Sequence, residues 1–313
     1  MLATETVSVA RQEAWPALPL ADWQETYTTL HMWTQIVGKV RLALSPHLNH
    51  WWEVPLYVNA QGLTTSPIPY RGELFEAQFD FIDHKLQIDT SWGDRKTLWL
   101  TPRSVAEFYR EFMDALQELG IEVKIWPMPV EIPHPIRFDE DNTHASYDAE
   151  QAHRFFLILR SADTIFKEFR ARFIGKDSPV HFFWGSFDLC VTRFSGRRAP
   201  ERPEADRITR EAYSHEVSSA GFWPGGSWLG TAELNGAAFY SYAVPEPAGF
   251  REARVRPEKA FYAPEFREFF FMYDDLRASE NPREALLEFL QSTYEAAADL
   301  GKWDRVALER AVR

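Results

Sequence analysis

The stretch Leu74–Gly120 decides the fold, and it reads LFEAQFDFIDHKLQIDTSWGDRKTLWLTPRSVAEFYREFMDALQELG. In its first part, apolar residues alternate with polar ones: Phe75, Ala77, Phe79 and Phe81 lie between Glu76, Gln78 and Asp80. A period of two is typical of a strand with one face in a core. Its last part opens at Ser104, carries apolar residues at helical spacing and ends at Gly120, which predicts a capped amphipathic helix. We therefore expect a half-buried sheet followed by a helix.

The same patterns outside this stretch predict two rounds of similar elements. The first has a helix over 22–44, strands over 51–59, 74–89 and 96–100, the helix that Gly120 ends, and a proline-rich edge strand over 121–132. The second has a helix over 149–174, strands over 180–194, 238–244 and 269–273, and a helix over 281–300 followed by Gly301. Each round is a helix, three strands and a capped helix.

Short sequence similarities between the rounds support a duplication. His50-Trp51-Trp52 matches His181-Phe182-Phe183, and Leu119-Gly120 matches Leu300-Gly301. The predicted class is α+β, with two related helix–antiparallel-sheet–helix halves packed as one compact unit. We place an N-terminal extension at 1–21, the first half at 22–132, a connector at 133–148, and the second half at 149–313 with an exposed inserted loop over 197–235. The alternative is two α+β stretches that share a common pattern by chance.

Composition restricts the partners and the compartment. The single cysteine, Cys190, cannot form an intramolecular disulfide, which fits a reducing compartment. The first 20 residues lack the apolar core of a secretory signal, and no later segment has the apolar length of a membrane span. A net charge of -12 disfavours binding to a phosphate backbone. These features predict a cytoplasmic protein with neither a nucleic-acid nor a membrane partner.

Four residues are candidates for catalysis or for metal binding. His215 and Glu216 stand side by side in the inserted segment and suit general acid–base chemistry. A loop packed by Phe222 and Trp223 is the alternative interpretation of that segment. His50 and His181 open equivalent strands of the two halves, so imidazoles near a pseudo-twofold axis could share a metal or flank a substrate. Alternatively, each caps a turn by hydrogen bonding.

Other residues are candidates for ligand binding. His31 and Gln35 lie one helical turn apart and form a polar spot on an apolar helix face. Arg193 stands on the strand that follows His181. The chain is rich in aromatic residues, with 12 Trp, 11 Tyr and 24 Phe, and such rings pack cores or wall ligand sites. Trp51, Trp52 and Trp223 are the candidates for such walls.

Two functional hypotheses follow. The first is an enzyme or metal-dependent protein with a His/Glu site between the halves. The second is a small-molecule binding module with an aromatic-lined pocket and no catalysis. P-loop, dinucleotide-binding and nucleophile-elbow motifs are absent from the sequence. The sequence therefore identifies no cofactor, reaction or oligomeric state.

Several longer phrases carry a resemblance to a known family. They are LHMWTQIVGK at 30–39, NHWW at 49–52, HFFWGSFDL at 181–189 and SHEVSSAGFWPGG at 214–226. Over nearly its whole length the chain resembles a bacterial family filed as domain-of-unknown-function family 5996. The resemblance implies no activity and no functional residues.

Overall fold

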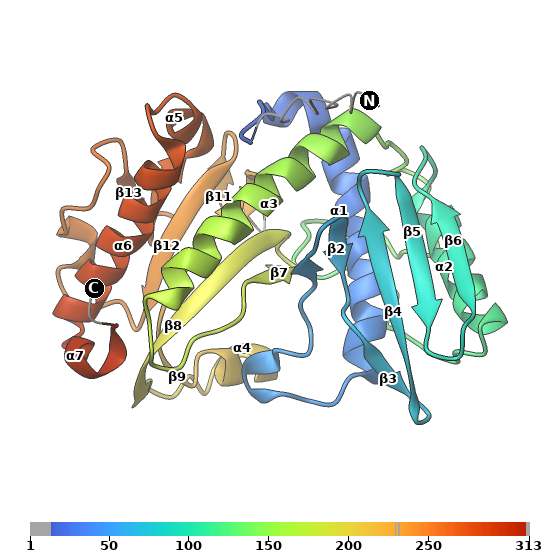
Figure 1. The fold of residues 1–313 in the computed structure, drawn as a ribbon, viewed down its shortest axis with the longest axis horizontal. Coiled ribbons are helices and arrows are strands. Elements are labelled where there is room, and N and C mark those ends of the chain that lie inside the picture. The colour runs from blue at the N-terminus through green and yellow to red at the C-terminus, as the bar shows by residue number, and fades with distance from the viewer. Residues whose placement is uncertain (1–13, 229, 231, 311–313) are drawn as a thin grey trace, which may run out of the picture.

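The structure is a computed structural model that describes residues 14–228, 230 and 232–310. It contains two six-stranded antiparallel sheets, each with helices packed against one face, and a small two-stranded sheet (Figure 1). The combination of helices and antiparallel sheets confirms the predicted α+β class. Within the described residues, no helix has the length and apolar character needed to cross a membrane.

The first half is a sheet with a helix before it and a helix after it. Its elements are α1 (Leu20–Leu44), η1 (Asn49–Trp51), β1 (Tyr57–Val58), β2 (Gly62–Thr64), β3 (Ile68–Tyr70), β4 (Glu73–Asp80), β5 (Lys85–Thr90), β6 (Arg95–Trp99) and α2 (Val105–Glu118). The predicted cap of α2 is present. Ser104 Oγ accepts a hydrogen bond from the backbone of Glu107 at 3.1 Å, and the Glu107 carboxylate accepts one from the backbone of Ser104 at 2.9 Å.

The second half also has a helix before its sheet and a helix after it, and its sheet likewise has six strands. Its helices are α3 (Ala149–Ala171), α4 (Arg207–Ala212), η2 (Phe250–Glu252), α5 (Tyr273–Arg277), α6 (Pro282–Leu300) and α7 (Arg305–Leu308). Its strands are β7 (His181–Phe183), β8 (Asp188–Arg198), β9 (His215–Trp223), β10 (Gly226–Trp228), β11 (Ala232–Leu234), β12 (Ala238–Val244), β13 (Phe261–Ala263) and β14 (Glu268–Met272). The six-stranded sheet of this half has the order β13-β14-β12-β9-β8-β7, and α3 and α6 cross the same face of it (Figure 1).

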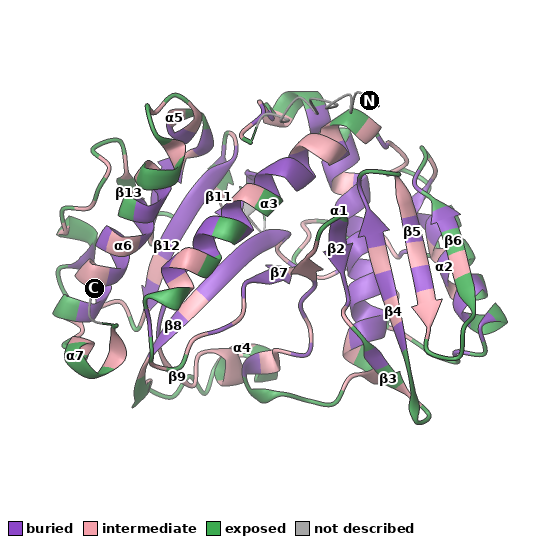
Figure 2. Ribbon diagram, in the orientation of Figure 1, coloured by how far each residue is buried: buried purple, intermediate pink, exposed green. Residues whose placement is uncertain are grey.

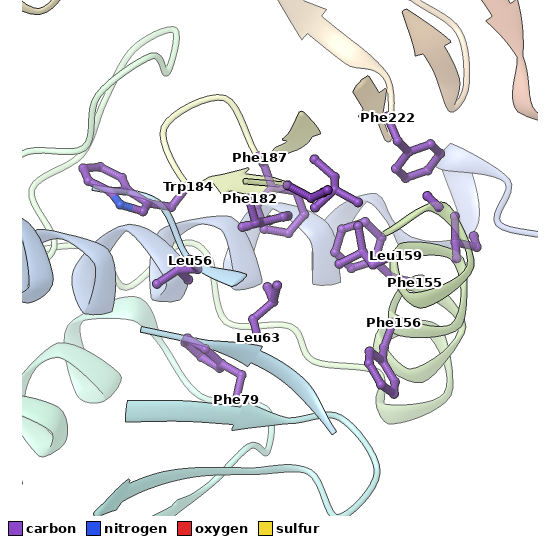
Figure 3. Packing of buried hydrophobic residues seen from close by; sticks show 14 of the residues in the cluster. Leu56, Leu63, Phe79, Phe155, Phe156, Leu159, Phe182, Trp184, Phe187 and Phe222 are labelled. Atoms are coloured by element: carbon purple, nitrogen blue, oxygen red, sulfur yellow. The ribbon is translucent and has the colours of Figure 1, made fainter. Parts of the chain in front are cut away.

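One hydrophobic core joins the two halves. Side chains from the first sheet, such as Leu63 and Phe79, belong to the same cluster as Phe155 of α3 and Phe222 of β9 (Figure 3). The two sheets also meet through the backbone, because Leu56 and Phe182 exchange hydrogen bonds of 2.9 and 2.8 Å. The elements that face the core are buried in both halves (Figure 2).

Helix α1 runs through the middle of this core. Every residue from Thr29 to Arg41 is buried, so polar side chains on this helix need partners inside the protein.

Four predicted elements were wrong. The strand expected over 180–194 is the hairpin of β7 and β8. Residues 121–132 contain no strand, since Pro127 and Pro129 cannot donate to a ladder. The strand expected over 74–89 is the hairpin β4–β5, with the turn residue His84 at φ 53°. The strand expected over 51–59 is reduced to the two residues of β1.

The inserted loop expected over 197–235 was also assigned incorrectly. It contains β9, which lies inside the second sheet, and Val217–Trp223 are all buried. Its run of small and apolar residues fills an interior strand that has no polar face. Most of the expected N-terminal extension, residues 1–13, lies outside the described residues, and α1 begins within its last part. The duplication itself stays a prediction.

Candidate functional site

The second sheet has one face that α3 and α6 do not cover, and we call it the outer face. Cross-strand register places one row of residues on it: His181, Cys190, Gly221, Tyr240, Phe270 and Phe261. Side chains in register share a face, and their chain neighbours point the other way. Phe239, next to Tyr240, accordingly points to the helix-covered face. Its ring centroid lies 6.2 Å from that of Phe166 on α3 and 6.1 Å from that of Trp15. The outer face carries its own small apolar cluster, which is separate from the main core.

Asp188 is the central polar residue of the outer face. Its side chain is buried, and it accepts hydrogen bonds from the hydroxyls of Ser186 and Tyr240. Burial raises the pKa of this carboxyl to about 6, although the two hydrogen bonds oppose the shift. Tyr240 reaches Asp188 by lying across Gly221, where a Cβ atom would collide with the tyrosine ring. A glycine on β9 is therefore required for the bond between β12 and β8.

Two further carboxyl groups lie near Asp188. Partial burial raises the pKa of Glu268 to about 8, and the negative charge of Asp188 adds to the shift. Glu131 reaches solvent, but loss of hydration still raises its pKa to about 7, again with a contribution from Asp188. Its carboxylate lies against Gly185, where a Cβ would be 2.5 Å from Oε1. The backbone is strained beside these groups, since Glu131 and Phe187 have φ of 56° and 60°.

None of the three carboxyl groups has a cationic partner among the described residues. Asp188 is bonded only to hydroxyls, and Glu131 and Glu268 form neither an ion pair nor a side-chain hydrogen bond there. Acids removed from water are ordinarily paired with a cation or shift their pKa upward. Here the pKa values rise chiefly because the carboxyls lose hydration, and no positive charge offsets that effect.

Aromatic rings and hydroxyls surround the three acids. Tyr240 and Tyr242 stack with ring centroids 6.1 Å apart, and the hydroxyls of Tyr242 and Tyr213 are 2.9 Å apart. Trp223 packs on Phe266 at 6.2 Å. Tyr213, Tyr242 and Glu268 are only half-buried, so solvent reaches this part of the outer face. The arrangement combines aromatic surface, hydroxyl groups and excess acid.

The thiol of Cys190 lies in the same row but is chemically quiet. It is buried, and burial raises its pKa to about 12, so the thiolate is scarce at neutral pH. We expect the native protein to react with the thiol reagent DTNB at least about a hundred times more slowly than the protein unfolded in guanidinium. Equal rates in the native and unfolded states would contradict this placement.

His31 and Gln35 hold loops of the site in place. The His31 Nε2 atom lies 3.0 and 2.9 Å from the carbonyls of Trp184 and Gly185, to which it donates as N–H. The Gln35 amide donates to the Val130 carbonyl at 2.8 Å and accepts from the Val130 N–H at 2.9 Å. Val130 directly precedes Glu131, and Trp184 and Gly185 lie in the turn before Asp188. Gln35 therefore positions Glu131, and His31 positions that turn. Their role in ligand binding stays a prediction.

Arg193, a predicted ligand-binding residue, points away from the outer face. It lies on the helix-covered side of β8, where its guanidinium stacks 3.5 Å from the ring centroid of Phe169 and 4.3 Å from that of Tyr294, and donates to the Phe169 carbonyl. Only 1% of its surface is exposed, so it is a core cation that no ligand reaches.

The four predicted catalytic residues do not converge. His50 and His215 are close, with ring centroids 5.6 Å apart, but Trp52 lies between His50 and His181, 5.4 and 5.7 Å from the two rings. Glu216 follows His215 on the strand and therefore points to the opposite face, where it bonds to Ser195 and Arg197 at 2.8 Å. Across residues 14–228, 230 and 232–310, no three His, Cys, Asp or Glu side chains are placed to hold a metal ion.

The predicted tryptophan walls do not form one surface. Trp223 lies on the outer face, Trp52 packs beside the imidazoles, and Trp51 lies under the guanidinium of Arg207 at 5.4 Å. A hollow of about 170 Å³ does exist, but it lies beside Glu216, between β12 and the end of α6, and its other lining residues are mostly apolar.

The sequence analysis did not identify Glu131, Tyr240 or Glu268 as site residues, nor Asp188 as the central group. Asp188, Tyr240 and Glu268 come from three strands that are neighbours only after the sheet forms, so no spacing along the chain relates them. The one available signal was Gly221, a glycine inside a strand, which marks a close approach by another group.

Comparison with known proteins gives a family but no relative of known activity. Residues 15–310 match the family described as "Family of unknown function (DUF5996)". Neither the curated proteins nor the solved structures provide a match.

Proposed function

The chain belongs to the DUF5996 family, to which no function is assigned, and from that premise we propose that its outer face binds a small organic molecule with a positively charged nitrogen. Asp188, Glu131 and Glu268 would supply the negative charge. Tyr240, Tyr242 and Trp223 would supply aromatic contact. The proposal is a form of the binding-module hypothesis, placed on residues other than those expected from the sequence.

The observation that carries the proposal is the group of three carboxyls without a cation. Each acid has a raised pKa, and the negative charge of Asp188 contributes to the shifts of the other two. A ligand cation placed among them would favour their ionised forms and lower all three pKa values. Binding would therefore release protons and remove an unfavourable repulsion.

The aromatic surroundings favour an organic cation over a hydrated inorganic ion. Ammonium groups bind against the faces of Trp and Tyr rings, most strongly where water is excluded. The metal alternative has no support from the geometry, because the imidazoles lie away from the acids and no set of three ligands forms among the residues described. The catalytic His/Glu hypothesis requires Glu216 to face His215, and these side chains lie on opposite faces of β9.

A panel of matched compounds tests this function. Phenethylamine, its trimethylammonium derivative and the neutral 2-phenylethanol differ chiefly in charge, and calorimetric titration at pH 7 measures their affinities. We expect both ammonium compounds to bind at least about tenfold more tightly than the alcohol, because only they neutralise the acids. Asp188→Asn and Glu268→Gln should each weaken ammonium binding by about tenfold.

A buried acid elsewhere provides the control for net charge. Asp163 on α3 is paired with Lys167 at 2.6 Å, on a helix that covers the opposite face of the sheet, and Asp163→Asn removes the same charge. Ammonium affinity should be unchanged in that variant. The proposal fails if phenylacetate binds as tightly as phenethylamine, or if no ammonium compound binds at millimolar concentration.

A further inference from the structure

We infer that Lys176, His50, His215 and Arg198 form a second site, which binds a phosphate group. The site lies where η1 of the first half meets β8, β9 and the loop before β7. It is separate from the acidic cluster and does not depend on the ammonium proposal.

The nitrogen-bearing side chains lie close together. Lys176 Nζ is 2.6 Å from His50 Nε2, and the rings of His50 and His215 are 5.6 Å apart. Arg198 is the direct cross-strand partner of His215, so the two side chains share a face of the sheet. The rings of Trp52 and Phe194 flank the Lys176 ammonium at 5.3 and 4.9 Å.

Hydrogen bonds orient both imidazoles. His50 Nδ1 lies 3.1 and 3.2 Å from the carbonyls of Glu211 and Ala212, so it carries the proton and Nε2 accepts from Lys176. The Ser214 hydroxyl donates to the Glu211 carbonyl at 2.8 Å, and its oxygen accepts from His215 Nδ1 at 3.0 Å. His215 Nε2 is therefore available to take up a proton and become a donor to an anion.

The cluster contains no carboxylate, although the protein carries a net charge of -12. The nearest acidic side chains are engaged elsewhere: Glu53 and Glu211 bond to His47 at 2.7 and 3.0 Å, Asp177 to Arg170 at 3.0 Å, and Glu216 to Arg197 on the opposite face. Lys176 and Arg198 have no ion-pair partner among the described residues. Their positive charges lower the pKa of His215, in addition to the effect of burial.

The backbone at His50 is strained, which is a further sign of a built site. His50 and Trp51 are consecutive residues with φ of 60° and 61°, a conformation that costs non-glycine residues free energy. The surrounding packing holds this backbone conformation, since only 6% of the His50 surface is exposed. Lys176 and Arg198 are exposed, so an anion from solvent can reach the site.

The donor set suits a tetrahedral oxyanion. An ammonium, a guanidinium and an imidazolium that approach from different elements can each donate to a different oxygen, with charge-assisted hydrogen bonds. A planar carboxylate has its acceptor sites in one plane and a single negative charge, so it matches donors from three directions less well. A phosphate group satisfies all three, and proton uptake by His215 would accompany its binding.

Histidine NMR with inorganic phosphate tests the site. The full chain is titrated with phosphate at constant ionic strength, and the pKa values of His50 and His215 are followed from their ring signals. We expect phosphate to raise the pKa of His215 by about one unit and to bind at least about tenfold more weakly to Lys176→Ala and to His215→Gln. Lys167→Ala, which removes a lysine paired with Asp163, should bind phosphate like the wild type.

Three outcomes would overturn the inference. The first is that phosphate leaves both imidazoles unchanged. The second is that acetate binds as tightly as phosphate, which would indicate general attraction of anions. The third is that Zn²⁺ and not phosphate perturbs the two rings, which would indicate a metal site. Because Lys176→Ala leaves the acidic cluster intact, its phenethylamine affinity should not change, and the two sites can be judged separately.

Discussion

At pH 8 the Asp188→Asn protein is expected to be more stable than the wild type. Asp188 has a pKa of about 6 in the folded protein, above the ordinary value of 3.8, because burial disfavours its charge. The folded state therefore binds its proton more tightly than the unfolded chain does. The wild type loses stability as pH rises from about 4 to about 6, and above pH 6 it carries the whole cost of the buried charge.

Asparagine has nearly the same shape and stays neutral, so the variant avoids this cost. A pKa difference of about two units corresponds to roughly 3 kcal/mol. Because asparagine replaces charge-assisted bonds to Ser186 and Tyr240 with neutral ones, we expect a net gain of about 1–3 kcal/mol in the free energy of unfolding. Urea denaturation at pH 8 and at pH 4 measures it, and the gain should disappear at pH 4.

Asp141→Asn is the control, and its effect should have the opposite sign. Asp141 is also buried, and burial alone would raise its pKa, but hydrogen bonds from His144 and Thr143 outweigh that effect and lower it. Its charge stabilises the fold at neutral pH, so the substitution should cost about 1–3 kcal/mol. If Asp188→Asn is destabilising by a similar amount at pH 8, Asp188 has an unrecognised cationic partner and the proposed ammonium site loses its basis.

A gain in stability with a loss of ligand affinity in one variant is the expected signature of a functional group. Proteins tolerate an unfavourable buried charge where activity needs it, and removing it commonly stabilises the fold. Asp188→Asn should combine both effects. A purely structural acid would give only the first.

Gly221→Ala is expected to destabilise the protein by about 3 kcal/mol. The added methyl would collide with the ring of Tyr240 and with the carbonyl oxygen of Leu189, and the second of these is backbone that cannot rotate away. Tyr240 must then leave Asp188, which removes a hydrogen bond and opens the outer-face cluster. Thermal and urea unfolding measure the loss, and phenethylamine affinity should fall with it.

Gly72→Ala is the matched control for adding a methyl to a glycine. Gly72 has φ of 91° in the turn between β3 and β4, and a Cβ there would contact nothing. Only backbone strain remains, so a cost of about 1 kcal/mol is expected. Equal costs at the two positions would mean that the close approach of Tyr240 to β9 does not hold in solution.

The local elements were predictable because their causes are local. The alternation in Phe75–Phe79 placed a half-buried strand, and Ser104 with Glu107 placed the start of α2, as the structure confirms. Prediction of strands failed where neighbouring strands decide whether a segment can pair. Residues 121–132 look apolar enough for a strand, but their prolines prevent pairing, and β9 looks like part of a loop until β8 and β12 flank it.

The candidate residues show the same division. His50 and His215 were two members of the predicted four-residue site, and their rings lie 5.6 Å apart, but Lys176 contacts His50 while Glu216 points to the opposite face. Adjacent residues on a strand face opposite sides, so a sequence pair such as His215-Glu216 separates as soon as the strand forms.

By itself the sequence determined the α+β class, the boundaries of the main helices and the acidic, aromatic-rich character of the chain, because periodicity, capping and composition act over a few residues. Only the tertiary structure decided that Asp188, Glu131 and Glu268 share one region and that Lys176 meets His50. Those residues are between 57 and 137 positions apart along the chain, and their geometry depends on sheet register and on the packing of the loops against the sheet. Burial then sets the charge of each group, and burial is a property of the assembled fold.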